Sequence, residues 1–182
     1  AAWATPRRAA EQARYRLAEW HSGRTVLDGA APARGRTVRW TTSSQGVRWW
    51  SDLDPRRYRA ICELWRENEL LDQIEQPFGL RILERRGNQL FLNGQPLYLR
   101  GMCEHGYFPL TTTPPRDEAF YHDNCMRLKD LGYNWIRFHT WAPGAEYLRA
   151  ADDAGMLVQL EAYHGFDAAD WQRILRHGRT HP

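Results

Sequence analysis

Three short polar stretches of the sequence hold side chains that suit acid–base chemistry and ligand binding. Carboxylates and imidazoles can transfer protons, a guanidinium can hold an anion, and an indole ring offers a flat apolar face with a polar edge. Six side chains in these stretches are candidates for substrate binding: Glu104, His105, Arg137, His139, Trp141 and Glu161. The combination predicts a site for a polar ligand.

Each polar stretch directly follows an apolar run that is typical of a strand. The runs are residues 97–99, 135–138 and 156–160, and the last is continuous enough to predict a parallel strand covered on both faces. Ligands bind beyond the carboxyl ends of parallel strands, because the loops converge there. We therefore expect the three polar stretches to lie together.

The segments between these runs have apolar residues at helical spacing. The first predicted helix follows Pro114-Pro115 and ends at Gly132, and the second ends at Gly155. Residues 170–177 predict a third helix. The expected order is therefore strand, helix, strand, helix, strand, which is typical of a parallel sheet.

The earlier part of the chain, from about residue 13 to residue 83, alternates apolar and polar residues with period two. The clearest alternation is in residues 15–17, 38–40 and 58–64, which predict half-buried antiparallel strands. Turn signals, among them Asp28-Gly29, separate them at spacings that suit a small sandwich. After this part, Asn93-Gly94 predicts a tight hairpin whose second arm runs on as a buried strand.

Arg137 carries the strongest physical argument among the candidates. A charge inside an apolar strand is costly unless it is paired, so something anionic should face it, and the same reasoning applies less strongly to Glu161. The other candidates have plausible roles without function. Glu104 and His105 could be solvated loop residues, and Trp141 could pack a loop against the core. Cys103 suits a small buried group better than a nucleophile.

Composition excludes several classes of function. The net charge is +3 and the basic residues are spread along the chain, which argues against nucleic-acid binding. The longest apolar runs are far shorter than the roughly 20 residues needed to cross a bilayer, which argues against a membrane protein. Three cysteines without CxxC spacing favour neither a disulfide framework nor a structural zinc site.

Two phrases in order resemble glycoside hydrolase family 2. Residues 78–81 (FGLR), followed by residues 90–101 (LFLNGQPLYLRG), resemble the family's junction between an immunoglobulin-like domain and a catalytic barrel. Residues 50–58 resemble a degraded phrase of the sandwich, and residues 134–137 and 155–162 resemble the family's second and third barrel strands.

The resemblance implies a fold of two parts. Residues 1–83 would be a partial, N-terminally truncated β-sandwich of the immunoglobulin-like kind. Residues 84–182 would be the N-terminal part of an incomplete (β/α)8 TIM barrel, with its first three strands.

The resemblance also implies hydrolysis of O-glycosidic bonds with retention of configuration. Family members act on β-galactosides, β-glucuronides and β-mannosides with one Glu as acid/base and another as nucleophile. Residues 179–182 resemble the phrase before the fourth strand, so both glutamates are expected beyond Pro182 and the chain alone is expected to be inactive. A carbohydrate substrate is expected, and no cofactor, metal ion, nucleic acid or membrane partner.

Individual residues match the family unevenly. His105 matches a substrate-pocket histidine, although Cys103 stands in place of a family Asn. Arg137 matches the arginine near the nucleophile carboxylate, whereas His139 corresponds only if the register slips by one. Glu104 is a further departure, and together these argue against assigning a β-galactosidase.

Two other functions compete with this one. A non-catalytic carbohydrate-binding module would keep Trp141 and Tyr107 without a carboxylate pair. A metal-dependent barrel hydrolase would use His105, His139, Glu161 and His164.

Overall fold

The computed structural model describes residues 10–34 and 37–182, which form two compact units. Unit 1 runs up to Arg48 and resumes at Arg57–Phe78, and unit 2 combines Trp49–Arg56 with Gly79–Pro182. The contact boundary thus differs from the continuous boundary at residue 83, because the segment Trp49–Arg56, here called the strap, packs with the later part of the chain.

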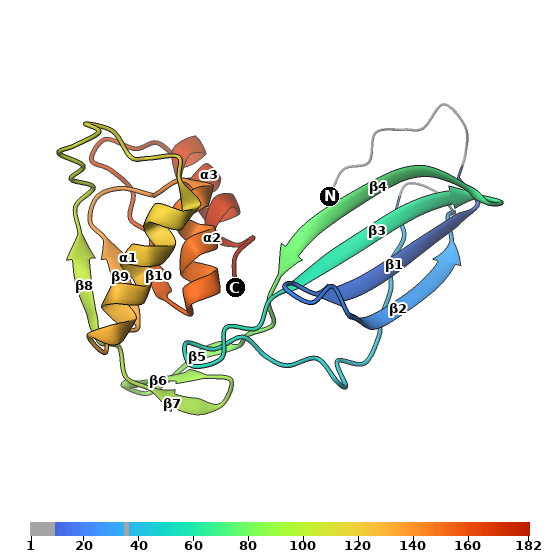
Figure 1. Cartoon of the computed structure of the whole chain (residues 1–182), viewed down its shortest axis with the longest axis horizontal. Coiled ribbons are helices and arrows are strands. Elements are labelled where there is room, and N and C mark those ends of the chain that lie inside the picture. Colours follow the sequence, from blue (N-terminus) through green and yellow to red (C-terminus); the bar gives the residue numbers. More distant parts are fainter. Residues whose placement is uncertain (1–9, 35–36) are drawn as a thin grey trace. The chain divides into compact units, whose positions relative to one another are not determined.

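Unit 1 is an antiparallel sheet with the strand order β2-β1-β3-β4 (Figure 1). Its strands are β1 (Gln12–Glu19), β2 (Thr25–Pro32), β3 (Tyr58–Arg66) and β4 (Glu69–Phe78). The strands predicted around residues 15–17 and 58–64 are confirmed as β1 and β3. Burial in β3 is not restricted to one face, because Ile61 is buried together with Tyr58 and Leu64.

Two local predictions in unit 1 are wrong. Asp28-Gly29 lies within β2 rather than in a turn, and Gly29 is paired with Tyr15 of β1. A Cβ on Gly29 would lie 2.6 Å from the Tyr15 ring, so the ring occupies the space a side chain would fill. Residues 38–40 form no strand, and Trp40 instead packs its ring against Tyr15 at 5.2 Å.

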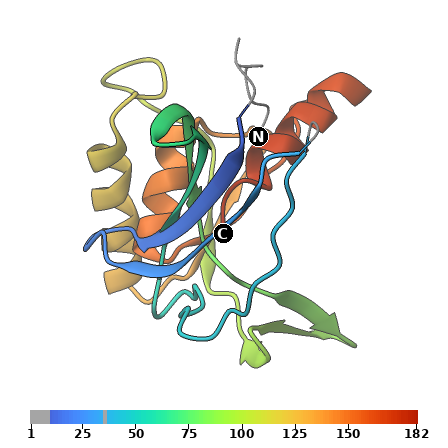
Figure 2. The same cartoon turned by 90° about the vertical axis from the view of Figure 1, so that its right-hand side faces the viewer.

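Unit 2 contains a parallel sheet with the strand order β10-β9-β8. Its strands and helices follow one another along the chain as β8 (Gly101–Glu104), α1 (Glu118–Asp130), β9 (Trp135–Phe138), α2 (Ala145–Ala154), β10 (Leu157–Gln159) and α3 (Ala168–Gly178). This confirms the predicted alternation of strands and helices. Helices α1 and α2 lie side by side (Figures 1 and 2), and Arg149 of α2 bonds Glu118 of α1 at 2.7 Å. Within the described ranges, no helix has the length and apolar character needed to cross a membrane.

Local capping explains where the helices begin and end. The Asp117 carboxylate accepts a hydrogen bond from the Ala119 amide at the start of α1, and Asp167 with Asp170 forms a capping box at the start of α3. Helix α2 ends at Gly155, whose φ of 71° is left-handed. Glycine adopts that conformation without steric cost, so the predicted stop is confirmed.

The core of unit 2 lies between the two helices and one face of β9. Ile136 and Phe138 are fully buried and pack in one cluster with Tyr121 and Cys125 of α1 and Tyr147 of α2. Burial raises the pKa of the Cys125 thiol to about 12, so this cysteine behaves as an apolar core group.

Side chains alternate across a strand, so the other face of β9 carries Trp135 and Arg137. Trp135 lies over Gly101, where a Cβ would approach the Trp135 carbonyl oxygen to 2.3 Å. The neighbouring β10 is only partly covered, since Leu157 and Val158 are half-buried and Gln159 is exposed. The prediction that this strand is covered on both faces is therefore wrong for this chain.

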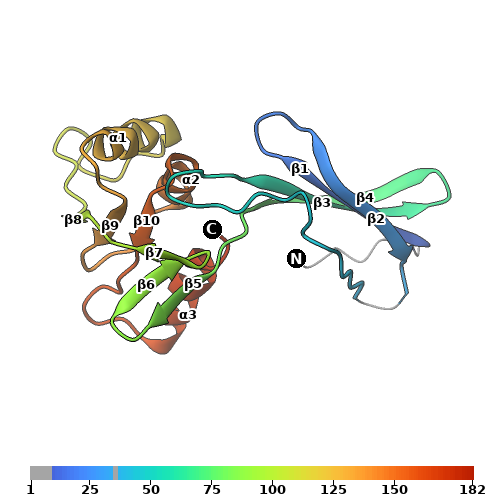
Figure 3. The same cartoon turned by 90° about the horizontal axis from the view of Figure 1, so that it is seen from below.

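A second, antiparallel sheet of unit 2 consists of β5 (Leu83–Arg86), β6 (Gln89–Leu92) and β7 (Gln95–Leu97) (Figure 3). The hairpin predicted at Asn93-Gly94 is confirmed, with φ angles of 53° and 79°. Its second arm does not run on, because β7 ends at Leu97 and the next strand begins at Gly101.

Candidate functional site

The carboxyl ends of β9 and β10 bring three of the six predicted site residues together. Arg137 Nε lies 2.5 Å from Glu161 Oε1. His139 Nδ1 lies 3.4 Å from the Arg137 Nη2 atom and 3.5 Å from Glu161 Oε2. We refer to Arg137, His139 and Glu161 as the charged cluster.

The expectation that an anion faces Arg137 is confirmed, and the anion is Glu161 of the neighbouring strand end. The hydrogen bond from Arg137, followed by one from the Thr140 amide, holds the pKa of Glu161 below its ordinary value. The same hydrogen bond stabilises the charged form of the guanidinium and therefore raises the pKa of Arg137. Both groups are therefore charged at neutral pH, and Arg137 is half-exposed rather than buried.

Two residues that the sequence did not indicate complete the surroundings of Glu161. The Thr140 amide donates to Oε2 at 3.1 Å, and Gln159 Nε2 donates to Oε1 at 3.1 Å. Thr140 has a φ of 61°, which a β-branched residue rarely adopts. Gln159 stands two residues before Glu161, so the period-two spacing of a strand could have indicated it, whereas no sequence pattern pointed to Thr140.

Glu104 is the last residue of β8 and His105 follows it, at the same end of the sheet. The main-chain oxygen of Glu104 accepts from the His139 amide at 2.9 Å, and its carboxylate accepts from the Gly106 amide at 2.7 Å. The His105 ring is 4.9 Å from the His139 ring in an edge contact and 6.0 Å from the exposed Tyr107 ring. Glu104 therefore shapes the loop, while His105 extends a row of rings away from the charged cluster.

Trp141 has a mainly structural environment. Its indole Nε1 donates to the Glu104 carbonyl at 3.2 Å, and its ring packs at 5.3 Å against Phe138 and at 6.2 Å against Phe108. A Cβ on Gly106 would lie 3.3 Å from the indole, so the loop after β8 closes over this ring. The geometry favours the core-plug interpretation of Trp141 over a stacking platform.

The geometry does not favour the metal-dependent alternative. Among residues 10–34 and 37–182, no three His, Cys, Asp or Glu side chains are placed to hold a metal ion together. His139 and Glu161 lie close together, but the Arg137 guanidinium contacts both of them, and its positive charge repels a cation.

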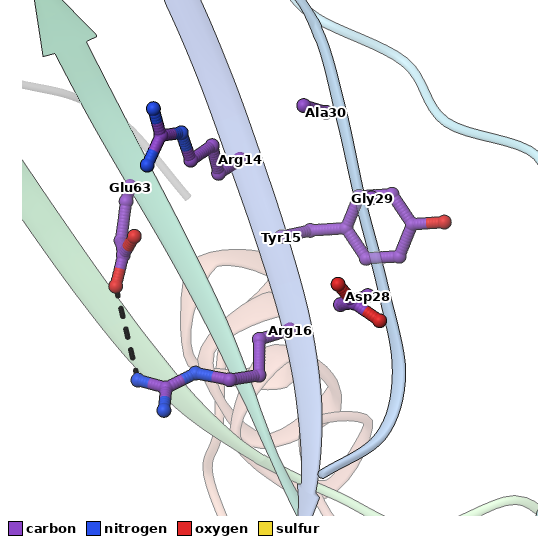
Figure 4. Close-up of a pocket in the computed structure, with 7 residues that line it drawn as sticks. All are labelled: Arg14, Tyr15, Arg16, Asp28, Gly29, Ala30 and Glu63. Atoms are coloured by element: carbon purple, nitrogen blue, oxygen red, sulfur yellow. Dashed lines mark ion pairs between the residues drawn. The ribbon is translucent and has the colours of Figure 1, made fainter.

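Unit 1 holds a separate hollow of about 430 Å³ over β1, β2 and β3 (Figure 4). Arg16 lies 3.8 Å from Glu63 in it, and the Tyr15 ring crosses Gly29. None of the six predicted site residues lines this hollow. We therefore place the candidate site on the parallel sheet of unit 2.

Comparison with known proteins agrees with the resemblance of the sequence. The family model "Glycosyl hydrolases family 2" matches residues 14–81. A β-galactosidase of Thermoanaerobacter pseudethanolicus is 28% identical over 130 residues, which are 70% of this chain and 18% of that protein. A β-glucuronidase of Streptococcus agalactiae is 33% identical over 112 residues, which are 62% of this chain and 18% of that protein.

Solved structures share the fold at lower identity. A family 2 glycosyl hydrolase of Bacteroides cellulosilyticus has a TM-score of 0.75 at 22% identity, over 94% of this chain and 25% of that one. A β-glucuronidase of Ruminococcus gnavus, solved with D-glucuronic acid, has a TM-score of 0.74 at 21% identity, over 96% of this chain and 31% of that one. The chain spans less than a fifth of the length of the two curated relatives named above. The sequence phrases, the family match over residues 14–81 and the curated relatives together support a resemblance of this chain to glycoside hydrolase family 2.

Proposed function

We propose that the protein carrying this chain is a retaining β-glycosidase that hydrolyses O-glycosidic bonds in carbohydrates. The observation that carries the proposal is the charged cluster, which lies where the strands of a parallel sheet end in a chain that resembles family 2. Ligands of such sheets bind at that edge.

The proposed fold assigns residues 1–83 to an immunoglobulin-like β-sandwich and residues 84–182 to the start of a (β/α)8 barrel. The antiparallel sheet β2-β1-β3-β4 and the sequential parallel order β8, β9, β10 support this assignment. Arg137 then lies on the sheet face opposite the helices, which is the interior face of a barrel.

In the proposed mechanism, the acid/base and nucleophile glutamates come from sequence after Pro182. One protonates the leaving oxygen while the other, about 5 to 5.5 Å away, attacks the sugar carbon. This chain supplies binding groups. Arg137 keeps donors beyond its Nε for an anion at the reacting centre, and His105 and His139 offer ring nitrogens to sugar hydroxyls.

Turnover by the intact protein tests the proposal. A panel of nitrophenyl β-galactoside, β-glucoside, β-glucuronide and β-mannoside should include at least one substrate, with the matched α-anomers as controls. Proton NMR should show the β-anomer of the sugar first, because two displacements retain configuration. Absence of turnover on the whole panel, or release of the α-anomer, would contradict the proposal.

The row of rings favours a second candidate, a non-catalytic carbohydrate-binding module. His105 lies parallel to the exposed Tyr107 at 6.0 Å, and such rings can hold a sugar without any carboxylate pair. Calorimetric binding of a sugar without turnover of any aryl glycoside would support this candidate.

A further inference from the structure

The carboxylate of Glu161 is already occupied by groups of its own chain. Oε1 accepts from Arg137 Nε at 2.5 Å and from Gln159 Nε2 at 3.1 Å, and Oε2 accepts from the Thr140 amide at 3.1 Å. A carboxylate offers about four acceptor positions, and His139 Nδ1 also lies 3.5 Å from Oε2. Three of these positions are taken and the side chain is only 19% exposed, so little of the Glu161 carboxylate is left for a sugar hydroxyl.

Arg137, in contrast to Glu161, keeps hydrogen-bonding groups that Glu161 does not use. A guanidinium carries five N–H donors, and Glu161 receives the one on Nε. The Arg137 side chain is 41% exposed, whereas that of Glu161 is 19% exposed. The exposed partner of this pair is therefore the one that can meet a ligand.

Glu161 also supports an unfavourable backbone conformation. Thr140 has a φ of 61°, and such a strained conformation persists only where the surroundings hold it. The Thr140 amide points to Glu161 Oε2, and His139 precedes it directly. One carboxylate thus joins the end of β9, the turn after it and the end of β10.

We propose that Glu161 is a positioning residue of the site rather than a sugar ligand. It holds the Arg137 guanidinium and the His139–Thr140 turn in one geometry, and Arg137 and His139 contact the substrate. The role toward a sugar rests on the proposed function, whereas the hold on Arg137 does not depend on it.

The first experiment measures Arg137 directly in the intact protein. Arginine labelled with ¹⁵N gives an Nε–H signal, which the Arg137→Lys variant assigns by its loss. In Glu161→Gln, water exchange of this proton should accelerate by about tenfold, because a hydrogen bond to a charged acceptor is lost. Unchanged exchange would overturn the proposal even if the protein hydrolyses no glycoside.

A matched control and a second variant support this measurement. Glu118→Gln breaks another Arg–Glu pair of unit 2, with Arg149 Nε at 2.7 Å, and should leave the Arg137 signal unchanged. If Glu161→Gln does not fold, Glu161→Asp replaces it. The shorter aspartate keeps the charge but withdraws from Arg137 Nε, so the same acceleration is expected.

The second experiment is a kinetic double-mutant cycle with the best substrate of the panel. Glu161→Gln and Arg137→Lys should each lower kcat/KM by about tenfold, and the double variant should lose little more, because coupled residues are not additive. A loss of about a hundredfold in the double variant would mean that Glu161 acts on the substrate independently, which would overturn the proposal.

Discussion

Arg137 is the residue on which sequence and structure agree best. Its position in an apolar strand required an anionic partner, and Glu161 provides one at 2.5 Å. The pair is partly exposed to solvent, so it is not a buried ion pair. Glu161 also offsets part of the positive charge that Arg137 can present to an anionic ligand.

Arg137→Ala should slow glycoside hydrolysis by the intact protein by roughly tenfold or more, since hydrogen bonds to charged groups contribute about 1.5 to 3 kcal/mol. The acidic limb of the kcat/KM profile should move upward in pH, because a carboxylate near Arg137 becomes easier to protonate. Initial rates between pH 3 and pH 8 check both effects. A folded variant with the parent's rate and profile would make Arg137 structural.

Glu161 should give a pH-dependent contribution to stability. Its pKa is lowered in the folded state from the ordinary 4.5, so its stabilisation is present above that value and is lost as the pH falls through the lower folded pKa. The difference in unfolding free energy between parent and Glu161→Gln should therefore shrink from pH 7 to pH 3 in urea titrations. An equal difference at both pH values would contradict the assignment.

Thr140→Gly should relieve the strain at φ 61°. Glycine adopts this conformation freely but loses more entropy on folding, so the expected net gain is about 0.5 to 1 kcal/mol of unfolding free energy. Thr140→Ala, which keeps the Cβ, is the control and should show no gain. Chemical denaturation compares the three proteins, and equal stability of the glycine variant and the alanine variant would argue against strain.

At the scale of elements, the strap Trp49–Arg56 is held to the rest of unit 2 by polar contacts. Trp50, which is 1% exposed, donates through Nε1 to the Asp152 carbonyl at 2.7 Å. Asn93 Nδ2 donates to the Trp50 carbonyl at 2.8 Å, and Asn134 Nδ2 donates to the Asp52 carboxylate at 3.0 Å. The turn residue Asn93 thus also fixes the strap.

Lys129, the single lysine of the sequence, joins α1 to this strap. Its Nζ donates to the main-chain oxygens of Asp52 and Gly155, and burial lowers its pKa. Lys129→Met should lower the unfolding free energy by about 1 to 2 kcal/mol, because two carbonyls lose a charged donor. Arg127→Met, at an exposed position of the same helix, is the control. Similar melting of the two variants would contradict this role.

At the scale of the molecule, several large apolar side chains of the described residues are exposed. Leu110, Tyr107 and Tyr98 are 97%, 83% and 76% exposed. The outer edges of β8 and β10 also have no partner strand among the described residues. Exposed apolar surface and open strand edges both favour association.

The isolated chain should therefore hydrolyse no aryl β-glycoside, since the proposed catalytic glutamates lie outside it, and it should bind an apolar fluorescent dye. Dye fluorescence and size-exclusion chromatography check the second expectation, with the intact protein as the control. Nitrophenol release above the buffer blank, or a monomer that binds no dye, would contradict the respective expectation.

The sequence by itself determined the features that short-range chemistry controls. Asn93-Gly94 predicted a hairpin and Gly155 a helix end, because positive φ angles depend on the residue itself. The apolar spacing of α1 predicted its buried face, since Tyr121 and Cys125 lie one helical turn apart. The family phrases likewise needed no structure.

Only the tertiary structure decided which distant groups meet. Asp28-Gly29 became part of β2, because pairing with β1 and the Tyr15 ring outweighed its preference for a turn. Glu161 reaches Arg137 across 24 residues of sequence, and it meets the Thr140 amide only because the strained turn after β9 points there. Contacts of this kind depend on how strands align side by side, and periodicity within one segment does not contain that alignment.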